Sequence, residues 1–562
     1  MNILLSRQNF GEGPIQKRWV KVDKSATARL ANAMPSVYSD ILLDLLEMID
    51  TPKSIAVAVC LRNIDQIETC DLKSVLSCDP YLYNDIRSYE LDSQAVGLLK
   101  KTRMFKRRYE KNLLDFYRTS EEAAKAQREI VESLSFSFEE RTLINRVAGI
   151  IRSIIGALPN SVSSRFGPGS TYCQSALDAT LFGKLTKIPE CTPLCSPILE
   201  NVMEKRFFHK AAIEYHVNSQ QLLFQRGSGR ALIFNRSYNE IVPGDRFCIV
   251  EKDIFKPRAM CPQPGGNMLV QLGLADLLER RFLRKTGIDL SKTDMVHRNI
   301  VEHCPDLFGT IDLSNASDSI SLALIELLFP RDWYWLIRSI TCRQTRVDGI
   351  WYPNSKAFAQ GCGITFIVEC IIFYAIAYAS VERQCIQSDP AKLVSVYGDD
   401  IIVPVDYTSS VIKDLQTFGF VVNREKSYGD DSLFKESCGM DSFLGHNVRP
   451  IFFKSFRPTL QGITILTNMV TKVILKIKGV WSFERVYHRL KKLYMILGES
   501  PLFVPKYFGM DEGIHSDIDH LTKVRHYIHY CKVYEYKKPT VVGSEFVALA
   551  ATATGNTGST FM

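Results

Sequence analysis

The stretch SVYGDDIIVP, residues 395–404, limits the fold of this chain more than any other feature of its sequence. Short runs of valine and isoleucine flank two adjacent aspartates, and a glycine stands directly before them. Apolar β-branched runs broken by a glycine-containing tetrad predict a strand, a tight turn and a second strand. We therefore expect a mostly buried hairpin with Asp399 and Asp400 at its tip. Because like charges and burial both raise a carboxylate pKa, a compensating cation is expected beside the pair.

A second acidic segment, GTIDLSNASDSIS, lies upstream at residues 309–321. Its apolar start predicts a strand, which puts Asp312 near the strand end, where side chains can face a cleft. Asp318 follows six positions later, after a run of small residues. Simpler explanations exist for both acidic sites: an Asp-Asp pair is common in solvated turns, and Asp312 alone could cap a helix.

Carboxylates that converge from separate strands suit nucleotidyl transfer. In that reaction, two divalent ions about 4 Å apart activate a 3′-hydroxyl and stabilise the leaving pyrophosphate. Mg²⁺ prefers hard oxygen ligands together with phosphate oxygens. We therefore expect two Mg²⁺ ions, for which Mn²⁺ can substitute, with Asp312 and Asp399 as bridging ligands and Asp400 beside them. The ions and a triphosphate would supply the compensating charge.

Four motifs, in order along the chain, resemble those of one polymerase family. The YGDD tetrad after an apolar strand, preceded by DLSNASD, resembles the palm of an RNA-dependent RNA polymerase. The whole set is most similar to the replicase catalytic (β) subunit of positive-strand RNA bacteriophages of the levivirus type. That family shows D-x-S-x-A-S-D, G-x-G-x-T-F, Y-G-D-D and G-F-x-x-N-x-x-K, which stand here at residues 312–318, 361–366, 397–400 and 419–426. The likeness is collinear from about residue 165 to residue 453.

The resemblance implies an α+β fold with the right-hand polymerase architecture of fingers, palm and thumb, in which the palm is built on an antiparallel sheet. The implied domains are 1–160, an N-terminal helical region that forms part of a fingers/thumb bridge; 161–305, fingers with a basic nucleotide-binding segment; 306–450, the palm with the catalytic motifs; and 451–562, a helical thumb and C-terminal tail.

Basic residues are candidates for handling phosphate. The segment VEKDIFKPRAM, residues 250–260, places Lys252, Lys256 and Arg258 ahead of the palm, where such polymerases hold the incoming triphosphate. Arginine can donate two parallel bonds to phosphate, whereas lysine acts as a point charge. Phage replicases usually read Val-Pro-Lys here, and Lys252 and Arg258 match that pattern best; a surface basic loop is the alternative. Lys426 stands where related polymerases place a possible general acid near pyrophosphate, and an exposed helix-end lysine is the alternative.

Asp318, Gly361, Gly363, Thr365 and Glu369 are candidates for nucleotide recognition at the sugar. Glycine lacks a Cβ, so a backbone can approach a nucleotide closely, and the threonine and glutamate fall one helical turn apart. A carboxylate can accept a bond from the 2′-hydroxyl, which distinguishes ribo- from deoxyribonucleotides. Many viral RNA polymerases have asparagine at the position of Glu369, and a buried structural glutamate is the alternative.

These features predict RNA-templated synthesis of RNA that replicates a positive-strand phage genome. A reverse transcriptase is the nearest rival, but those enzymes usually have an apolar residue at position 398 and a bulky aromatic after the first aspartate. This chain has Gly398 and only small or polar residues at 314–317. A non-catalytic RNA-binding protein with a palm fold is a second rival, against which the intact carboxylates argue. A helicase is disfavoured, because the sequence has no G-x-x-x-x-G-K-[ST] motif.

The expected partners are template RNA and nucleoside triphosphates, and the net charge of +8 is compatible with a polyanion. The resemblance also implies host translation elongation factors Tu and Ts and a host small-subunit ribosomal protein. No membrane is expected: the start MNILLSRQNF has too short an apolar run for a signal peptide, and the apolar segment Ile364–Ser380 carries Glu369, which favours a buried helix. The 15 cysteines lack zinc-site spacing. We expect a protein of the bacterial host cytoplasm.

Overall fold

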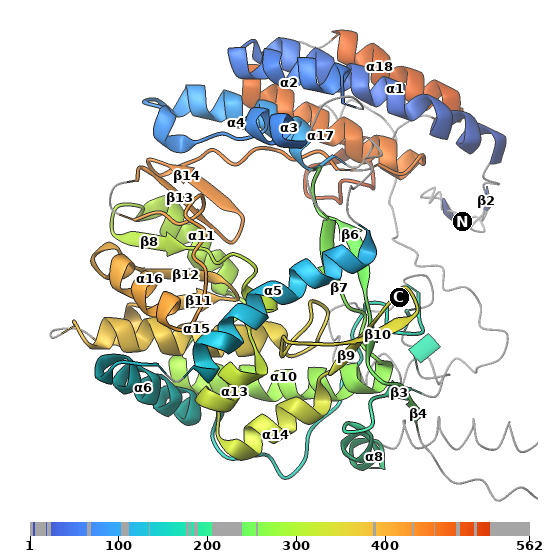
Figure 1. The fold of residues 1–562 in the computed structure, drawn as a ribbon. Coiled ribbons are helices and arrows are strands. Elements are labelled where there is room, and N and C mark those ends of the chain that lie inside the picture. The colour runs from blue at the N-terminus through green and yellow to red at the C-terminus, as the bar shows by residue number, and fades with distance from the viewer. Residues whose placement is uncertain are drawn as a thin grey trace, which may run out of the picture. The chain divides into compact units, whose positions relative to one another are not determined.

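The chain divides into two compact units in this computed structural model (Figure 1). Unit 1 comprises residues 1–108, 251–256 and 448–542, and unit 2 comprises residues 109–250, 257–447 and 543–562. The structure describes residues 4–5, 18–19, 24–64, 69–102, 112–133, 135–175, 179–180, 183–184, 189–204, 239–254, 257–385, 389–429, 432–454, 456–478, 484–499 and 503–516. Two further segments are candidates for contact with RNA, the basic run KKTRMFKRRYEK at residues 100–111 and the basic, aromatic-rich run around Tyr536, with a solvated helix face as the alternative for each; residues 103–111 and the run around Tyr536 lie outside these ranges.

Unit 1 is mainly helical. Its helices are α1 (Lys24–Ile49), α2 (Pro52–Arg62), α3 (Thr69–Val75), α4 (Ile86–Lys100), α17 (Leu460–Lys478) and α18 (Glu484–Leu497), with a short 3₁₀ turn η1 (Pro80–Leu82). Its strands are β1 (Leu4–Leu5), β2 (Arg18–Trp19), β16 (Phe503–Pro505) and β17 (Ile514–Ser516). The expectation of a helical region over residues 451–562 misses β16 and β17, which pair in parallel.

Apolar side chains at helical spacing build the core of unit 1. Leu30, Tyr38 and Leu45 of α1 are fully buried, and α1 packs along α18. A charged contact joins the same two helices, since Arg489 of α18 donates to Asp40 and Asp44 of α1, each at 2.6 Å. Such forked arginine–carboxylate bonds fix how one helix face meets another.

Apart from Lys252 and Lys256, which belong to unit 1, all the predicted site residues lie in unit 2. Its helices are α5 (Leu113–Glu132), α6 (Phe138–Ile155), α8 (Ser196–Glu204), α10 (Gly265–Thr286), α11 (Thr293–His303), α12 (Ala316–Ser319), α13 (Leu322–Leu328), α14 (Arg331–Ile340), α15 (Thr365–Glu382) and α16 (Thr408–Thr417), with 3₁₀ turns η2 (Pro390–Lys392) and η3 (Val405–Tyr407). Its strands are β3 (Glu190–Cys191), β4 (Glu240–Ile241), β5 (Asp245–Arg246), β6 (Cys248–Glu251, whose last residue belongs to unit 1), β7 (Pro257–Met260), β8 (Phe308–Ile311), β9 (Gln344–Val347), β10 (Ile350–Pro353), β11 (Ser395–Tyr397), β12 (Asp400–Pro404), β13 (Phe434–Ser437), β14 (Met440–Phe443) and β15 (His446–Asn447). The expected mixture of helices and antiparallel strands is present.

Helix α15 is the core of unit 2. It is apolar on all sides, as expected of a helix enclosed by other elements, and most of its residues are buried. Helices α6 and α16 and strand β11 pack against it. In the described part of the chain, α15 and residues 460–477 of α17 are long and apolar enough to cross a membrane, and 83% and 56% of these windows are buried in the protein. The predicted buried helix after residue 364 is confirmed.

A three-stranded antiparallel sheet with the order β11-β12-β8 carries the acidic motifs. In its hairpin, Tyr397 pairs with Asp400 across a turn of two residues, as the glycine-containing tetrad predicts. Gly398 has φ +62°, and a Cβ there would lie 3.1 Å from the ring of Phe366 on α15. The rings of Phe366 and Tyr397 pack in a T-shaped arrangement, with their centroids 4.9 Å apart. Glycine is therefore required both by the turn and by the aromatic side chain packed under it.

Candidate active site

Asp312 lies at the end of β8, where the sequence predicts it. Ile311 pairs with Ile401 on β12, so one further step along this antiparallel ladder sets Asp312 opposite Asp400. A neighbouring segment holds Asp312 in place: its backbone N–H donates to Ser427 Oγ at 3.1 Å, and its Oδ2 accepts a bond from Asn423 Nδ2 at 2.8 Å. The carboxylate is therefore fixed by the stretch that carries the fourth sequence motif. We did not single out Asn423, although it is the asparagine of that motif.

Asp399 and Asp400 lie at the tip of the β11–β12 hairpin, as expected. Asp400 Oδ2 accepts a bond from the backbone N–H of Cys438 at 3.2 Å. Cys438 and Gly439 form the two-residue turn between β13 and β14, both with positive φ (+47° and +76°), which is the conformation of a type I′ hairpin turn. The tips of two hairpins therefore meet beside the carboxylates.

A buried histidine connects the same two hairpins, and the sequence alone did not indicate it. His297 of α11 bonds Ser437 Oγ through Nδ1 and Ser395 Oγ through Nε2, both at 2.9 Å. Burial lowers the pKa of His297 to about 4, so the ring is neutral at ordinary pH and accepts from one hydroxyl while donating to the other. His297 therefore orients the strands that carry the acidic turn rather than adding charge to it.

The acidic side chains repel one another. Burial raises the pKa of Asp400 to about 7, and the charges of Asp399 and Asp312 add to the shift. Burial also raises the pKa of Asp312 to about 6, a shift that Lys426 opposes and Asp399 increases. No group of three or more His, Cys, Asp or Glu side chains in the described ranges is arranged to hold a metal ion as it stands. The donor set nevertheless consists of hard carboxylate oxygens with excess negative charge, which is the chemistry that Mg²⁺ requires.

Lys426 supplies a positive charge next to the carboxylates. It lies in a turn, where its N–H donates to Asn423 O at 3.0 Å, and not at a helix end. Burial lowers its pKa, but the charges of Glu436, Asp312 and Asp400 outweigh that effect, so the pKa is raised. Its Nζ lies 3.6 Å from Glu436 Oε1. The lysine is therefore protonated and partly neutralised.

Asp318 and Glu369 are both buried in unit 2. Asp318, on α12, accepts a bond from Lys356 Nζ at 3.1 Å. Burial raises the pKa of Glu369 well above its ordinary value, and Asp399 and Asp318 add to the shift. Glu369 Oε1 and Thr365 Oγ1 are buried without a hydrogen-bond partner in the described structure. Buried polar atoms normally have partners, so this pair at the start of α15 has capacity for a ligand.

The two glycines before α15 have packing reasons of their own. Gly361 has φ +115°, and a Cβ there would lie 2.7 Å from the backbone oxygen of Cys261. Gly363 donates its N–H to Gln271 Oε1 at 2.9 Å, and a Cβ there would lie 3.1 Å from Leu272. Close approach of α10 and β7 to this loop accounts for both residues, while their contact with a nucleotide stays a prediction.

The basic segment is only partly described. Arg258 is exposed on β7. Burial raises the pKa of Asp318, and the charges of Lys356 and, to a smaller extent, Arg258 oppose that shift. Lys252 is exposed and belongs to unit 1, whereas Lys256 lies outside the described residues. The charge of Arg258 therefore acts on Asp318, another predicted site residue.

Seven of the 13 described cysteines are buried, five are half-buried and one is exposed. Cys191 and Cys195 are both fully buried. The side-chain contact with Cys191 and burial raise the pKa of the Cys195 thiol well above its ordinary value.

Comparison with known proteins adds family relationships to this geometry. The family described as RNA replicase, beta-chain, matches residues 118–549. RNA-directed RNA polymerase subunit beta of Qbeta virus (strain MX1) is 30% identical over 361 residues, which cover 63% of this chain and 56% of that protein. The RNA-directed RNA polymerase beta chain of Escherichia phage MS2 is 30% identical over 300 residues, covering 52% and 54%. The chain thus spans about half the length of the curated relatives it matches.

Solved structures show weaker similarity. The RNA-dependent RNA polymerase of a human picorbirnavirus matches with a TM-score of 0.31 and 13% identity, over 47% of this chain and 57% of that one. A foamy viral protease-reverse transcriptase in complex with dsDNA matches with a TM-score of 0.25 and 13% identity, over 70% and 73%. These scores are too low to establish a shared fold. The family match, in contrast, extends over more than half of the sequence, and the chain therefore belongs to the RNA replicase β-chain family.

Proposed function

We propose that this chain is an RNA-templated RNA polymerase that replicates the genome of a positive-strand RNA phage. One observation supports the proposal above all: Asp312 and Asp400 stand opposite each other on adjacent strands, with Asp399 in the intervening turn, in a chain of the replicase family. In this proposal β8, β11 and β12 belong to a palm within residues 306–450. Residues 161–305 would form fingers, 1–160 a fingers/thumb bridge and 451–562 a thumb.

The acidic residues have distinct proposed roles. Asp312 and Asp399 would bridge two Mg²⁺ ions, with Asp400 beside them and Mn²⁺ able to substitute. When bound, such ions lower the pKa of the attacking 3′-hydroxyl and neutralise charge on the leaving pyrophosphate. Asn423 holds Asp312 through Oδ2, and the Cys438 N–H holds Asp400 through Oδ2. These bonds limit the rotation of both carboxylates and so prepare them for ligand binding.

The remaining predicted residues would bind and orient the nucleotide. Lys252, Lys256 and Arg258 would contact the triphosphate. Gly361 and Gly363 would shape the loop, and Asp318, Thr365 and Glu369 would face the sugar. Lys426, which is protonated, would donate a proton to the leaving pyrophosphate.

The proposed partners and location are those that the family resemblance implies. The substrates would be template RNA and ribonucleoside triphosphates. Host elongation factors Tu and Ts and a host small-subunit ribosomal protein would assemble with the chain, and the work would take place in the cytoplasm of the bacterial host.

An incorporation assay on an RNA template tests the function. With Mg²⁺, and with or without added host factors Tu and Ts, the purified chain should incorporate ribonucleotides in preference to 2′-deoxynucleotides. Equal or preferred use of deoxynucleotides would favour a reverse transcriptase. Absence of metal-dependent incorporation under every condition would favour a non-catalytic RNA-binding protein.

Removing Arg258 should mainly weaken nucleotide binding. A bond to a charged group is typically worth about 1.5–3 kcal/mol, so Arg258→Ala should raise the KM for nucleotides by about tenfold or more, with a smaller effect on kcat. Steady-state kinetics over a range of nucleotide concentrations measures both. Arg331→Ala, which removes an exposed arginine at the start of α14, is the control. A lower affinity for RNA with unchanged nucleotide dependence would contradict the triphosphate role.

Divalent ions should stabilise the fold most at high pH. The folded pKa values of about 6 for Asp312 and about 7 for Asp400 lie above the ordinary carboxylate value. In the metal-free protein, these two carboxyl groups therefore stabilise the fold fully at a pH below about 3.9, their pKa in the unfolded chain. This stabilisation is lost as the pH rises through their pKa values in the folded protein. Metal-free Tm should fall between pH 5 and pH 8, by about 2–4 °C for each kcal/mol lost.

Mg²⁺ should reverse that loss, because it binds the ionised carboxylates of the folded state. Thermal unfolding at pH 5 and pH 8, with and without Mg²⁺, measures the effect. Asp400→Asn removes one titrating group and should reduce both the pH dependence and the Mg²⁺ effect. An Mg²⁺-induced increase in Tm of the same size in this variant would argue against Asp400 as part of the metal site.

A further inference from the structure

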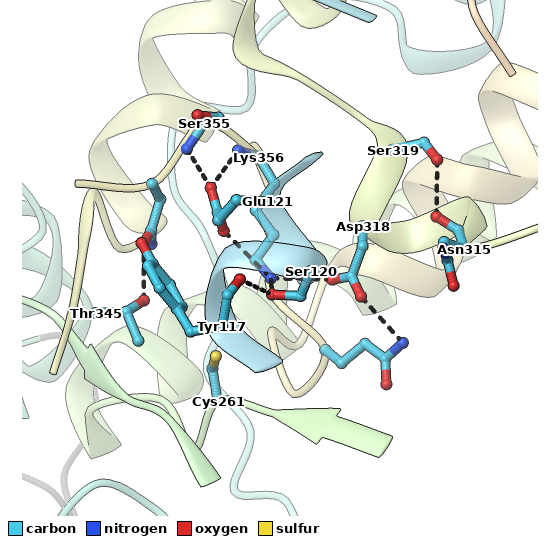
Figure 2. Close-up of polar contacts among 12 residues, drawn as sticks. Tyr117, Ser120, Glu121, Cys261, Asn315, Asp318, Ser319, Thr345, Ser355 and Lys356 are labelled. Atoms are coloured by element: carbon cyan, nitrogen blue, oxygen red, sulfur yellow. Dashed lines mark hydrogen bonds and ion pairs between the residues drawn. The ribbon is translucent and has the colours of Figure 1, made fainter. Parts of the chain in front are cut away.

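A buried ion cluster lies next to the proposed sugar site (Figure 2). Lys356, which precedes the loop leading to α15, has a side chain only 1% exposed, between Glu121 at 2% and Asp318 at 8%. Its Nζ lies 3.3 Å from Glu121 Oε1 and 3.1 Å from Asp318 Oδ1, and it also donates to Ser120 Oγ at 3.0 Å. Two carboxylates thus share one ammonium group out of contact with water.

Glu121 fixes the segment that carries the lysine. Its Oε2 accepts the backbone N–H groups of Ser355 and Lys356. The next residue, Ala357, donates its N–H to Ile320 O at 2.7 Å, which ties the same segment to the chain just after Asp318. Helix α5 therefore holds both the backbone and the charged end of Lys356.

Helix α5 also contacts the Asp318 segment directly. Gln127, on α5, accepts the N–H of Ser321 at 2.7 Å and donates to Phe418 O at 3.0 Å. Side chains of α5 thus bind both the segment that follows Asp318 and the segment that carries Lys356. None of Glu121, Gln127 or Lys356 belongs to the four palm motifs.

The two oxygens of Asp318 are not equivalent. Oδ1 is committed to Lys356, whereas the partner of Oδ2 among the described residues is Gln360 Nε2 at the long distance of 3.5 Å. Burial raises the pKa of Asp318, and the Lys356 charge opposes this, which favours the ionised form that can only accept hydrogen bonds. Oδ2 of Asp318 can therefore accept a hydrogen bond from a hydroxyl group of a ligand.

Stability alone is a weak reason for such a cluster. Removing two carboxylates and an ammonium from water costs about as much as their attraction returns, and apolar side chains of similar size often do as well. A buried charge network does, however, fix the direction of each of its members. The orientation of Asp318 is therefore the property that this cluster determines most directly.

We infer that Lys356, held by Glu121, is a positioning residue that turns Asp318 Oδ2 toward the 2′-hydroxyl of the incoming ribonucleotide and thereby sets the preference for ribose. This inference rests on the proposed polymerase function. It extends the sugar site to α5, a helix about two hundred residues upstream of Asp318 in the sequence.

Selectivity for the sugar, and not activity alone, tests the inference. The kcat/KM values for a ribonucleoside triphosphate and its 2′-deoxy analogue are measured on an RNA template with the full chain and Mg²⁺. Lys356→Met keeps an unbranched side chain but removes the charge. It should lower the ratio of kcat/KM for the ribonucleotide to kcat/KM for the deoxynucleotide by about tenfold. A misplaced Asp318 carboxylate would lose most of its hydrogen bond to the 2′-hydroxyl, whereas the deoxynucleotide has no 2′-hydroxyl and would be affected less. Glu121→Gln should lower the ratio in the same direction but less.

Arg383→Met is the matched control, since Arg383 is likewise the cationic partner of a buried carboxylate, Asp414, at 2.6 Å. It should leave the ratio unchanged. Equal losses for both sugars in Lys356→Met would show a purely structural role and overturn the inference while leaving the polymerase function intact. If Lys356→Met does not fold, Glu121→Gln decides: an unchanged ratio overturns the inference and a reduced ratio supports it. A wild-type chain without any incorporation would overturn the proposed function, and this inference with it.

Discussion

Replacing Asp399 with asparagine should reduce nucleotide incorporation by about 10²–10³-fold, the loss typical of removing one preorganised group that stabilises transition-state charge. Asparagine has nearly the same shape as aspartate, but its amide lacks the charge that a bridging metal ligand contributes. The turn at the hairpin tip depends on Gly398 and not on the aspartate side chain. The fold should therefore persist, and the loss should fall mainly on kcat. Single-turnover incorporation on a primed RNA template measures it.

Asp406→Asn is the control for that experiment, because it removes an exposed aspartate in η3, directly after β12. Its incorporation rate should match that of the unmodified chain. Wild-type rates in a folded Asp399→Asn variant would falsify the assignment of this residue as a metal ligand. Higher Mg²⁺ or Mn²⁺ concentrations should restore part of the activity if the defect lies in metal binding.

Replacing Lys426 with methionine should lower kcat by about 10²-fold, the lower end of the range for general acid catalysis. The lysine is protonated because Glu436, Asp312 and Asp400 together outweigh the effect of burial on its pKa. A side chain without a proton to give would slow departure of pyrophosphate. The KM for nucleotides should change less, because the loss concerns the transition state more than ground-state binding.

The pH profile separates this role from simple loss of charge. With the general acid removed, the decline of kcat at high pH should move or disappear, whereas Lys426→Arg should retain the charge without transferring a proton as readily. Lys413→Met, which removes an exposed lysine on α16, should leave kcat and its pH profile unchanged. A Lys426→Met variant with the wild-type rate and profile would exclude the acid role.

Short-range patterns explain why much of the acidic site could be predicted from sequence. The β11–β12 hairpin follows from apolar β-branched runs on either side of a glycine-containing turn, and β8 follows from the apolar run before Asp312. That β8 lies beside β12 could be expected only from the family resemblance, because the sequence pattern gives no sign of contact between strands about ninety residues apart. The buried helix α15 was predicted by the continuous apolar segment Ile364–Ser380.

The supporting residues could not be predicted, since their contacts depend on the tertiary fold. Lys356 and Glu121 are separated by 235 positions and look like ordinary charged residues in the sequence. His297 on α11 had no motif around it, and its role arises where β11 and β13 meet. Strands β16 and β17 are too short and too irregular in pattern to be distinguished from the helices before them.

The tight register of the β11–β12–β8 ladder restricts changes in chain length near the hairpin. Side chains alternate between the faces of a sheet, so one residue gained or lost between Ile401 and Pro404 would turn Asp400 to the opposite face. Natural or engineered variation should therefore accumulate here as substitutions, while insertions and deletions should be confined to the loops beyond the strands. The number of residues between the acidic turn and the end of β12 should therefore stay constant.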